Sequence, residues 1–265
     1  MYAFDYHRPT SVKEAVGLLT DGAKIVAGGH TLLPTMKQRL AAPESLIDLG
    51  RIPDLVGIER TPRSLTIAAM TTHGAVAESA EVKEAIPALA ELAALIGDPA
   101  VRHRGTIGGS VANNDPAADY PAACLALGAT ILTNKRKLSS EEFFLGLFET
   151  ALEEGEIVTG VSFPIPHKAA YEKFRNPASR YALVGVFVAK RPSDIRVAVT
   201  GSGSNGVFRW TEAEDALAKR FSPKSLEGMS ASPDGLNSDL HADAAYRAHL
   251  IGVMARRAVQ KAADR

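Results

Sequence analysis

The sequence predicts an α+β protein that combines parallel and antiparallel strands, and three observations lead to this prediction. Strand, helix and strand patterns follow one another within residues 24–49, as in a β-α-β unit. Residues 55–59 and 65–69 are strand candidates separated by turn residues, which is typical of a hairpin. The length of 265 residues exceeds the ~100–200 residues of a usual single domain, so we expect two units.

Composition excludes several classes of protein. Hydrophobic residues make up 46% of the chain and charged residues 23%, as in ordinary globular proteins. Thirty basic and thirty acidic residues cancel, which argues against nucleic acid or anionic lipid as a partner. No apolar run approaches the ~18 residues of a membrane span, and the first residues lack the layout of a secretory signal. We therefore expect a cytoplasmic protein without a membrane span.

Metal chemistry is not expected in this chain. Cys124 is the only cysteine, so neither an intramolecular disulfide nor a four-thiolate iron–sulfur cluster can form, and we expect a small core residue. The seven histidines show no spacing that would place two ligands on one face.

The first half of the chain begins with a helix pattern at residues 12–20, capped by Ser11. A strand is expected at 24–27, and a helix capped by Thr31 runs to about 39 with Pro34 in its first turn. The strand at 45–49 completes the β-α-β unit. Residues 82–96 form a wide helical stripe in which Pro87 predicts a kink or a break.

The second half begins with a helix at 120–127, capped by Asp119 and ended by Gly128. Strands are expected at 129–132 and 157–163, and the FPIPH run sets a domain boundary near His167. Beyond it we expect strands at 181–189 and 195–200, a helix at 211–220 capped by Thr211, and a helix at 242–263. Basic residues on this last helix are expected to be solvated or to face a partner: Arg247, Arg256, Arg257 and Lys261.

A pair of glycines, Gly28 and Gly29, lies between the strand at 24–27 and the next helix. Consecutive backbone N–H groups can bind a diphosphate when residues without a Cβ allow close approach, and a helix N-terminus adds partial positive charge. Two glycines after a strand can also form a tight turn with no ligand.

A second cluster spans the sixteen residues 104–119, which show no hydrophobic periodicity. Such a run inside a compact domain usually lines a site. Thr106 and Ser110 can add hydroxyl donors beside Gly108 and Gly109. Asp119 would repel a phosphate, so we expect it to accept hydrogen bonds from ribityl or ribose hydroxyls, in addition to capping the next helix.

A third cluster, residues 201–206, matches the G-x-G-x-x-G dinucleotide pattern. The four residues that follow favour extended backbone, whereas the fingerprint requires a helix there. We therefore expect a mobile loop or turn and not a Rossmann site.

Two of these segments, AGGHTLLP and TIGGSVANNDPAADYPA, resemble the FAD-binding signatures of the medium subunits of molybdenum hydroxylases of the xanthine dehydrogenase and aerobic carbon monoxide dehydrogenase type. FFLGLFETALEEGEIVTGVSFP resembles the end of that family's flavin domain, and YEKFRNPASRYALVGV its C-terminal domain. The resemblance covers nearly the whole chain. Two departures are Ser110, where many relatives have asparagine, and the short TNKRKLSSEEFF connection.

The resemblance implies a vanillyl-alcohol-oxidase (PCMH) type FAD-binding domain over 1–167, with α+β subdomains of about 1–54 and 55–167. A smaller α+β domain of the carbon monoxide dehydrogenase flavoprotein C-terminal type follows over 168–265. It also implies a basic contact at Lys173 or Arg175 and no catalytic acid or base. The implied FAD-binding residues are Ala27, Gly28, Gly29, His30, Thr31, Leu32, Ile96, Thr106, Ile107, Gly108, Gly109, Ser110, Asp119, Val158 and Lys173.

The implied function is the flavin stage of an electron relay. A large molybdopterin subunit hydroxylates the substrate, [2Fe–2S] clusters in a small subunit carry the electrons, and FAD in this chain passes them to an external acceptor. Such complexes are dimers of heterotrimers. One alternative is a self-contained oxidase with FAD attached through His30, but the residues after 167 are too few for the substrate domain of such an enzyme. The other is a non-catalytic assembly subunit that has lost FAD, and the intact glycines argue against it.

Overall fold

A computed structural model describes all residues, 1–265. Its N-terminal part is a three-stranded parallel sheet with the order β1-β3-β2. Neighbouring residues of β3 point to opposite faces, so Ile47 packs with Ala15 of α1 and Leu46 packs with Met36 of α2. The predicted β-α-β unit is confirmed. The elements are β1 (Asp5–His7), α1 (Val12–Gly17), β2 (Ala23–Val26), α2 (Leu32–Lys37), β3 (Ser45–Asp48), and the 3-10 turns η1 (Leu49–Arg51) and η2 (Pro53–Leu55).

The central part contains a five-stranded antiparallel sheet with the order β4-β5-β10-β6-β7. Leu65 and Ile67 of β5 are buried in one core cluster with residues of the helices α3, α4, α5, α7 and α8. The elements are β4 (Ile58–Arg60), β5 (Ser64–Ala68), α3 (His73–Glu78), α4 (Ala80–Ala85), α5 (Pro87–Ala94), α6 (Pro99–Arg104), α7 (Ile107–Asn113), α8 (Tyr120–Leu127), β6 (Thr130–Thr133), β7 (Lys137–Ser139), α9 (Ser140–Phe143), β8 (Phe144–Gly146), β9 (Glu149–Thr150) and β10 (Val158–Pro164).

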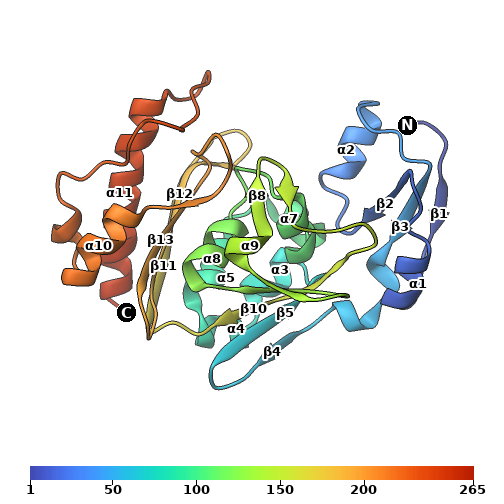
Figure 1. Cartoon of the computed structure of the whole chain (residues 1–265), viewed down its shortest axis with the longest axis horizontal. Helices are drawn as coiled ribbons and strands as arrows, with labels where there is room; N and C mark the ends of the chain where they lie inside the picture. The colour runs from blue at the N-terminus through green and yellow to red at the C-terminus, as the bar shows by residue number, and fades with distance from the viewer.

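The C-terminal part is an antiparallel sheet with the order β11-β12-β13-β14. Residues of β12 alternate between two cores: Val186 packs with α10 and α11, and Phe187 packs in the central core. Figure 1 shows α10 and α11 on the outer side of this sheet and α8 on its inner side. The elements are β11 (Lys168–Arg175), β12 (Ala182–Lys190), β13 (Ile195–Thr200), β14 (Phe208–Arg209), α10 (Thr211–Lys219), η3 (Pro223–Leu226) and α11 (Ala244–Ala263).

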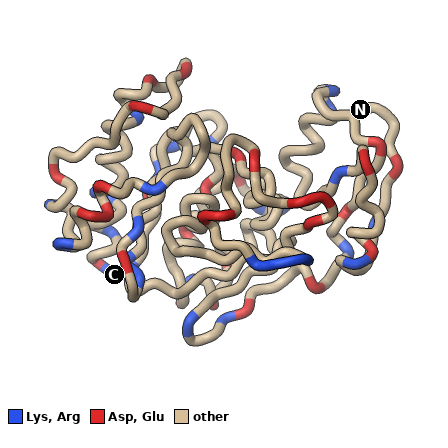
Figure 2. Tube along the Cα trace, in the orientation of Figure 1, with Lys and Arg blue, Asp and Glu red and all other residues tan.

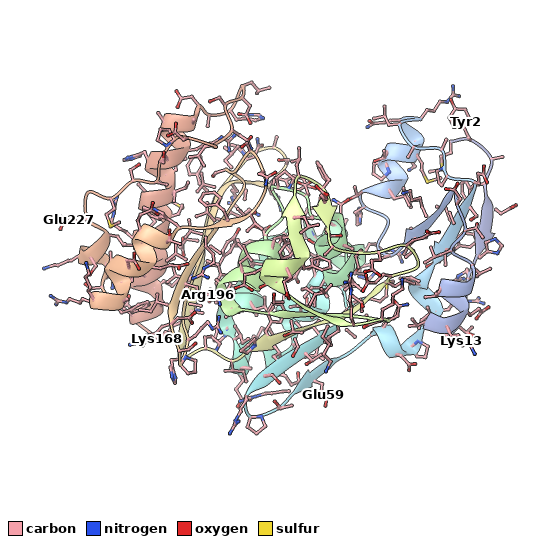
Figure 3. The ribbon with its side chains drawn as sticks, viewed as in Figure 1. Tyr2, Lys13, Glu59, Lys168, Arg196 and Glu227 are labelled. Carbon is pink, nitrogen blue, oxygen red and sulfur yellow. The ribbon has the colours of Figure 1, made fainter.

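The central and C-terminal parts share one core across the expected boundary near His167. Tyr171 and Phe187 belong to the same buried cluster as the central helices. Arg196 of β13, labelled in Figure 3, forms an ion pair with Glu141 of α9. The division of the chain at 167 stays a prediction. No helix is both long and apolar enough to span a bilayer.

The segment 104–119 differs from its prediction. It was expected to be irregular, but it contains helix α7 because Ile107 and Val111, four residues apart, both enter the central core. The Thr106 hydroxyl accepts a hydrogen bond from the Gly109 N–H and so caps this helix.

Three predicted caps are also wrong: the side chains of Thr31, Asp119 and Thr211 make no capping hydrogen bond. The cap by Ser11 and the break at Pro87 are confirmed. Cys124 is fully buried, as expected.

Arg247 was expected on the surface of the last helix but is only 2% exposed. Its guanidinium donates to the backbone oxygens of Leu183 at 2.7 Å and Gly201 at 3.1 Å, and it pairs with Asp239. A guanidinium with several donors can satisfy carbonyls that no backbone N–H reaches. The loop at 201–206 contains no helix, in agreement with the rejection of a Rossmann site.

Candidate functional site

A cleft of about 890 Å³ is lined by residues of all three parts of the chain. This volume is near the upper end of the ~300–1,000 Å³ of ligand sites. Ile107 is fully buried and lies outside the lining, because its side chain faces the core. The other residues implied by the family resemblance all line the cleft: Ala27, Gly28, Gly29, His30, Thr31, Leu32, Ile96, Thr106, Gly108, Gly109, Ser110, Asp119, Val158 and Lys173.

The first glycine loop presents free backbone donors to this cleft. It connects the end of β2 at Val26 to the start of α2 at Leu32. The N–H groups of four consecutive residues, from Gly28 to Thr31, donate to no acceptor within the chain. Gly29 has a φ of +76°, which turns the backbone in a way that other residues rarely allow. Adjacent free N–H groups of this kind form an anion-binding concavity.

Gly28 is required by the second glycine loop. A Cβ at Gly28 would lie 2.3 Å from the carbonyl oxygen of Arg104 and 2.7 Å from the Cα of Gly105. Both contacts are to backbone, which cannot rotate away as a side chain would. Gly28 is therefore needed for the close approach of the two loops as well as for access by a ligand.

The second loop offers no comparable donors. The N–H groups of Ile107 and Gly108 donate to Thr71 at 3.1 Å and Ala69 at 2.8 Å. The next two N–H groups, of Gly109 and Ser110, donate to the hydroxyl and carbonyl of Thr106. Unlike the first glycine pair, Gly108 and Gly109 therefore present no free amides, because the capped helix uses them. Its contribution to the cleft is a close-packed wall and the side chains of Thr106 and Ser110.

Asp119 and Lys173 form a buried ion pair at the side of the cleft. Their side chains are 5% and 2% exposed, and Lys173 Nζ lies 2.9 Å from Asp119 Oδ2. The Tyr171 hydroxyl donates to the other carboxylate oxygen, and Lys173 also donates to the Leu95 carbonyl at 3.2 Å. Burial raises the pKa of Asp119, and Lys173 and Tyr171 oppose that rise. Between the two basic candidates, Lys173 lines the cleft and Arg175 is exposed outside it.

Two lining residues have no sequence signal that would have identified them. His73 is 5% exposed, and its Nδ1 has no hydrogen-bond partner. Burial lowers the pKa of His73 to about 4, so the ring is neutral at pH 7. Tyr181 is 50% exposed at the cleft. Both are common residue types in unremarkable sequence contexts, and only the fold brings them to the site.

Glu156 holds one edge of the cleft in place. Its carboxylate accepts from Arg136 Nε and a terminal guanidinium nitrogen, both at 3.0 Å, and from the Thr133 hydroxyl at 2.7 Å. These hydrogen bonds, led by that of Arg136, lower the pKa of Glu156 to about 2. The ion pair therefore fixes the segment that precedes β10.

The lining fits a flavin dinucleotide. Free amides from Gly28 to Thr31 suit the diphosphate, and Ile96 and Val158 add apolar surface for a ring. No group of three or more His, Cys, Asp or Glu side chains is placed to hold a metal ion.

Comparison with known proteins gives a consistent assignment. Residues 2–166 match the family described as "FAD binding domain in molybdopterin dehydrogenase". The carbon monoxide dehydrogenase medium chain of Hydrogenophaga pseudoflava is 37% identical, over 98% of this chain and 96% of that protein. The nicotine 6-hydroxylase medium subunit of Paenarthrobacter nicotinovorans is 34% identical, over 99% of this chain and 98% of that one.

A solved structure of reconstituted carbon monoxide dehydrogenase from Oligotropha carboxidovorans contains a chain of the same fold. The TM-score is 0.89 at 36% identity, with 100% of this chain and 99% of that chain covered. From the match over residues 2–166 and the near full-length similarity, the chain belongs to the family of FAD-binding medium subunits of molybdenum hydroxylases.

Proposed function

We propose that the chain is the flavin stage of a molybdenum hydroxylase, receiving electrons from [2Fe–2S] clusters of a partner subunit and delivering them to an external acceptor. When bound, FAD supplies the electron-accepting and electron-donating ring chemistry. The chain itself supplies position and polarity. Its one cysteine, Cys124, is fully buried, so clusters that take four thiolates belong to another subunit.

The observation that carries this proposal is the row of free N–H groups from Gly28 to Thr31 at the cleft. None of these four residues is buried, so their N–H groups are open to a ligand, and a diphosphate supplies the acceptors they lack. The cofactor's diphosphate therefore lies on the first loop, with Ala27 and Leu32 at its two ends.

The rest of the cleft is assigned from the chemistry of its walls. Ile96 and Val158 offer apolar surface to the isoalloxazine ring, which excludes water from one side. Lys173 favours the ionised form of Asp119, and the carboxylate lines the cleft as an acceptor for cofactor hydroxyls. Thr106 and Ser110 add to the wall beside the first loop.

The partners follow from the division of labour in such an enzyme. We infer a large molybdopterin subunit and a small iron–sulfur subunit, assembled as a dimer of heterotrimers in the cytoplasm. The two relatives described above are named for different substrates, carbon monoxide and nicotine, yet both match this chain over nearly its full length. Substrate choice is therefore assigned to the large subunit and not to this chain.

Titration of the purified chain with FAD, FMN and riboflavin tests whether the first loop binds the diphosphate. Binding is followed by quenching of flavin fluorescence. We expect FAD to bind at least tenfold more tightly than riboflavin, because riboflavin has no phosphate to accept hydrogen bonds from the free N–H groups. Equal affinity for the three flavins would remove the diphosphate assignment.

Acid precipitation separates the oxidase alternative. We expect the flavin to stay in the supernatant, since His30 is one of the four free-amide residues and needs no covalent role. Flavin retained in the protein pellet would favour a self-contained oxidase with attachment at His30.

A further inference from the structure

The hairpin formed by β8 and β9 ends in three exposed apolar side chains. Leu145 and Leu147 are each 52% exposed, and Phe148 is 56% exposed. Isolated apolar residues are common on protein surfaces, whereas several large ones side by side mark a contact surface. Leu145, Leu147 and Phe148 are called the hairpin tip below.

The backbone at the hairpin tip is strained. Phe148 has a φ of +55°, a conformation that bulky side chains rarely adopt. Its N–H donates to the Asn114 carbonyl at 3.2 Å, which maintains this turn. The strained backbone leaves the ring of Phe148 more than half exposed to solvent. Strain that is maintained to hold a largely exposed apolar ring points to a contact made outside the chain.

The hairpin is fastened to the wall of the cofactor cleft. The side-chain amide of Asn114 donates to the carbonyls of Gly146 and Glu149, both at 2.8 Å, and so joins the two strands. Asn114 is the C-cap of α7, whose first turn lines the cleft. On the opposite side, a Cβ at Gly146 would lie 3.1 Å from Asn205 Oδ1, so the loop at 201–206 packs against the hairpin. The hairpin tip is thus held at a fixed position relative to the cleft.

The surface around the hairpin tip is acidic. Residues 139–166 contain six glutamates and no lysine or arginine, and Figure 2 shows acidic segments along this stretch. Glu153 and Glu156 pair with Lys135 and Arg136, so they do not belong to this acidic surface. Glu142 and Glu149, one before and one after the tip, form no ion pair, whereas Glu141 pairs with Arg196. An apolar centre with an acidic rim is complementary to an apolar pocket rimmed by lysine and arginine.

We propose that the hairpin tip is the docking site of the iron–sulfur subunit, which meets it with an apolar pocket rimmed by basic residues. This inference rests on the proposed function, because the electron-donating partner is the one that must be held at a fixed place beside the cofactor. The connection through Asn114 to α7 provides that fixed place. It also assigns a structural role to the loop at 201–206, which supports the hairpin and binds no nucleotide.

The test uses the chain co-expressed with the iron–sulfur and molybdenum subunits of its own complex. The double variant Leu147→Ser/Phe148→Ser is compared with Leu240→Ser, a matched control at a side chain that is 89% exposed and outside the hairpin. We expect the double variant to keep its FAD content and melting temperature but to assemble at least tenfold more weakly, as measured by size-exclusion chromatography. The control assembles like the natural chain. Assembly of the double variant at the natural level would overturn the proposal.

Phe148→Gly separates docking from folding. Glycine adopts a φ of +55° without strain, so the isolated chain should melt at the same or a higher temperature while assembly weakens. If the double variant instead abolished self-association of the isolated chain and left binding to the iron–sulfur subunit unchanged, a second copy would cover the tip and the proposal would be wrong. Failure of the proposed function is detected by a separate measurement, because the natural chain would then contain no flavin.

Discussion

Substitution of Gly28 by alanine tests the packing of the two glycine loops most sharply. The added Cβ would lie 2.3 Å from the Arg104 carbonyl oxygen, whereas ordinary contacts begin at 3.4 Å. The loops must therefore separate by about 1.1 Å. Overpacking of this kind costs ~1–3 kcal/mol, which corresponds to a roughly five- to 150-fold loss of FAD affinity if the FAD-bound form bears the cost.

FAD affinity is measured by fluorescence quenching and stability by thermal melting, where ~1 kcal/mol shifts Tm by roughly 2–4 °C in a chain of this size. Gly17→Ala is the matched control, because a Cβ there meets nothing within 4 Å. The control should keep its FAD affinity and be at least as stable, since glycine in a helix costs ~0.5–1 kcal/mol relative to alanine. Natural affinity and natural Tm in Gly28→Ala would refute the role given to this contact.

Three further predictions concern the buried ionisable groups of the cleft. The pKa of His73 is about 4 in the folded chain and ~6.5 in the unfolded chain, so its contribution to stability is present above pH 6.5 and is lost as the pH falls toward 4. This loss is worth about 3 kcal/mol in the free energy of unfolding, and His73→Gln should not show it. Lys173→Met should destabilise the chain by ~3–5 kcal/mol in urea unfolding by leaving Asp119 buried without its cation, and adding Asp119→Asn should recover most of that loss. The pKa of Glu156 is about 2, below its usual 4.5, so its contribution to stability is present above pH 4.5 and is lost as the pH falls toward 2. The free energy of unfolding of Glu156→Gln should therefore depend less on pH between 4.5 and 2. An unchanged pH dependence would contradict the role of Arg136.

Local sequence signals located the elements that carry their own start and stop residues. Helix α8 has Pro121 in its first turn and Gly128 at its end with a φ of +65°, and its bounds match the prediction. Strand β11 was not predicted, because YEKFR mixes polar and apolar residues without a regular alternation. Its Tyr171 and Lys173 are buried by packing against α5 and Asp119, which are distant in sequence.

Predictions that depend on the direction of a polar side chain were the least successful. Asp119 and Arg247 were assigned from their neighbours in sequence, as a helix cap and a surface charge. In the fold, Asp119 turns to Lys173 and Tyr171, and Arg247 turns to the carbonyls of Leu183 and Gly201. All four of these partners lie far away along the chain, so no local sequence pattern contains them. All of the residues implied by the family resemblance except Ile107 line the cleft, and their contacts with FAD stay a prediction. Reasoning from the residues alone pointed to the two glycine loops and Asp119.

The central claim is tested most directly by an absorption spectrum and metal analysis of the chain, purified alone and after co-expression with the other subunits of its complex. The account predicts flavin bands in the chain, and flavin together with iron and molybdenum in the recovered complex. Flavin without any partner would favour a self-contained oxidase, and no flavin in either preparation would contradict the account.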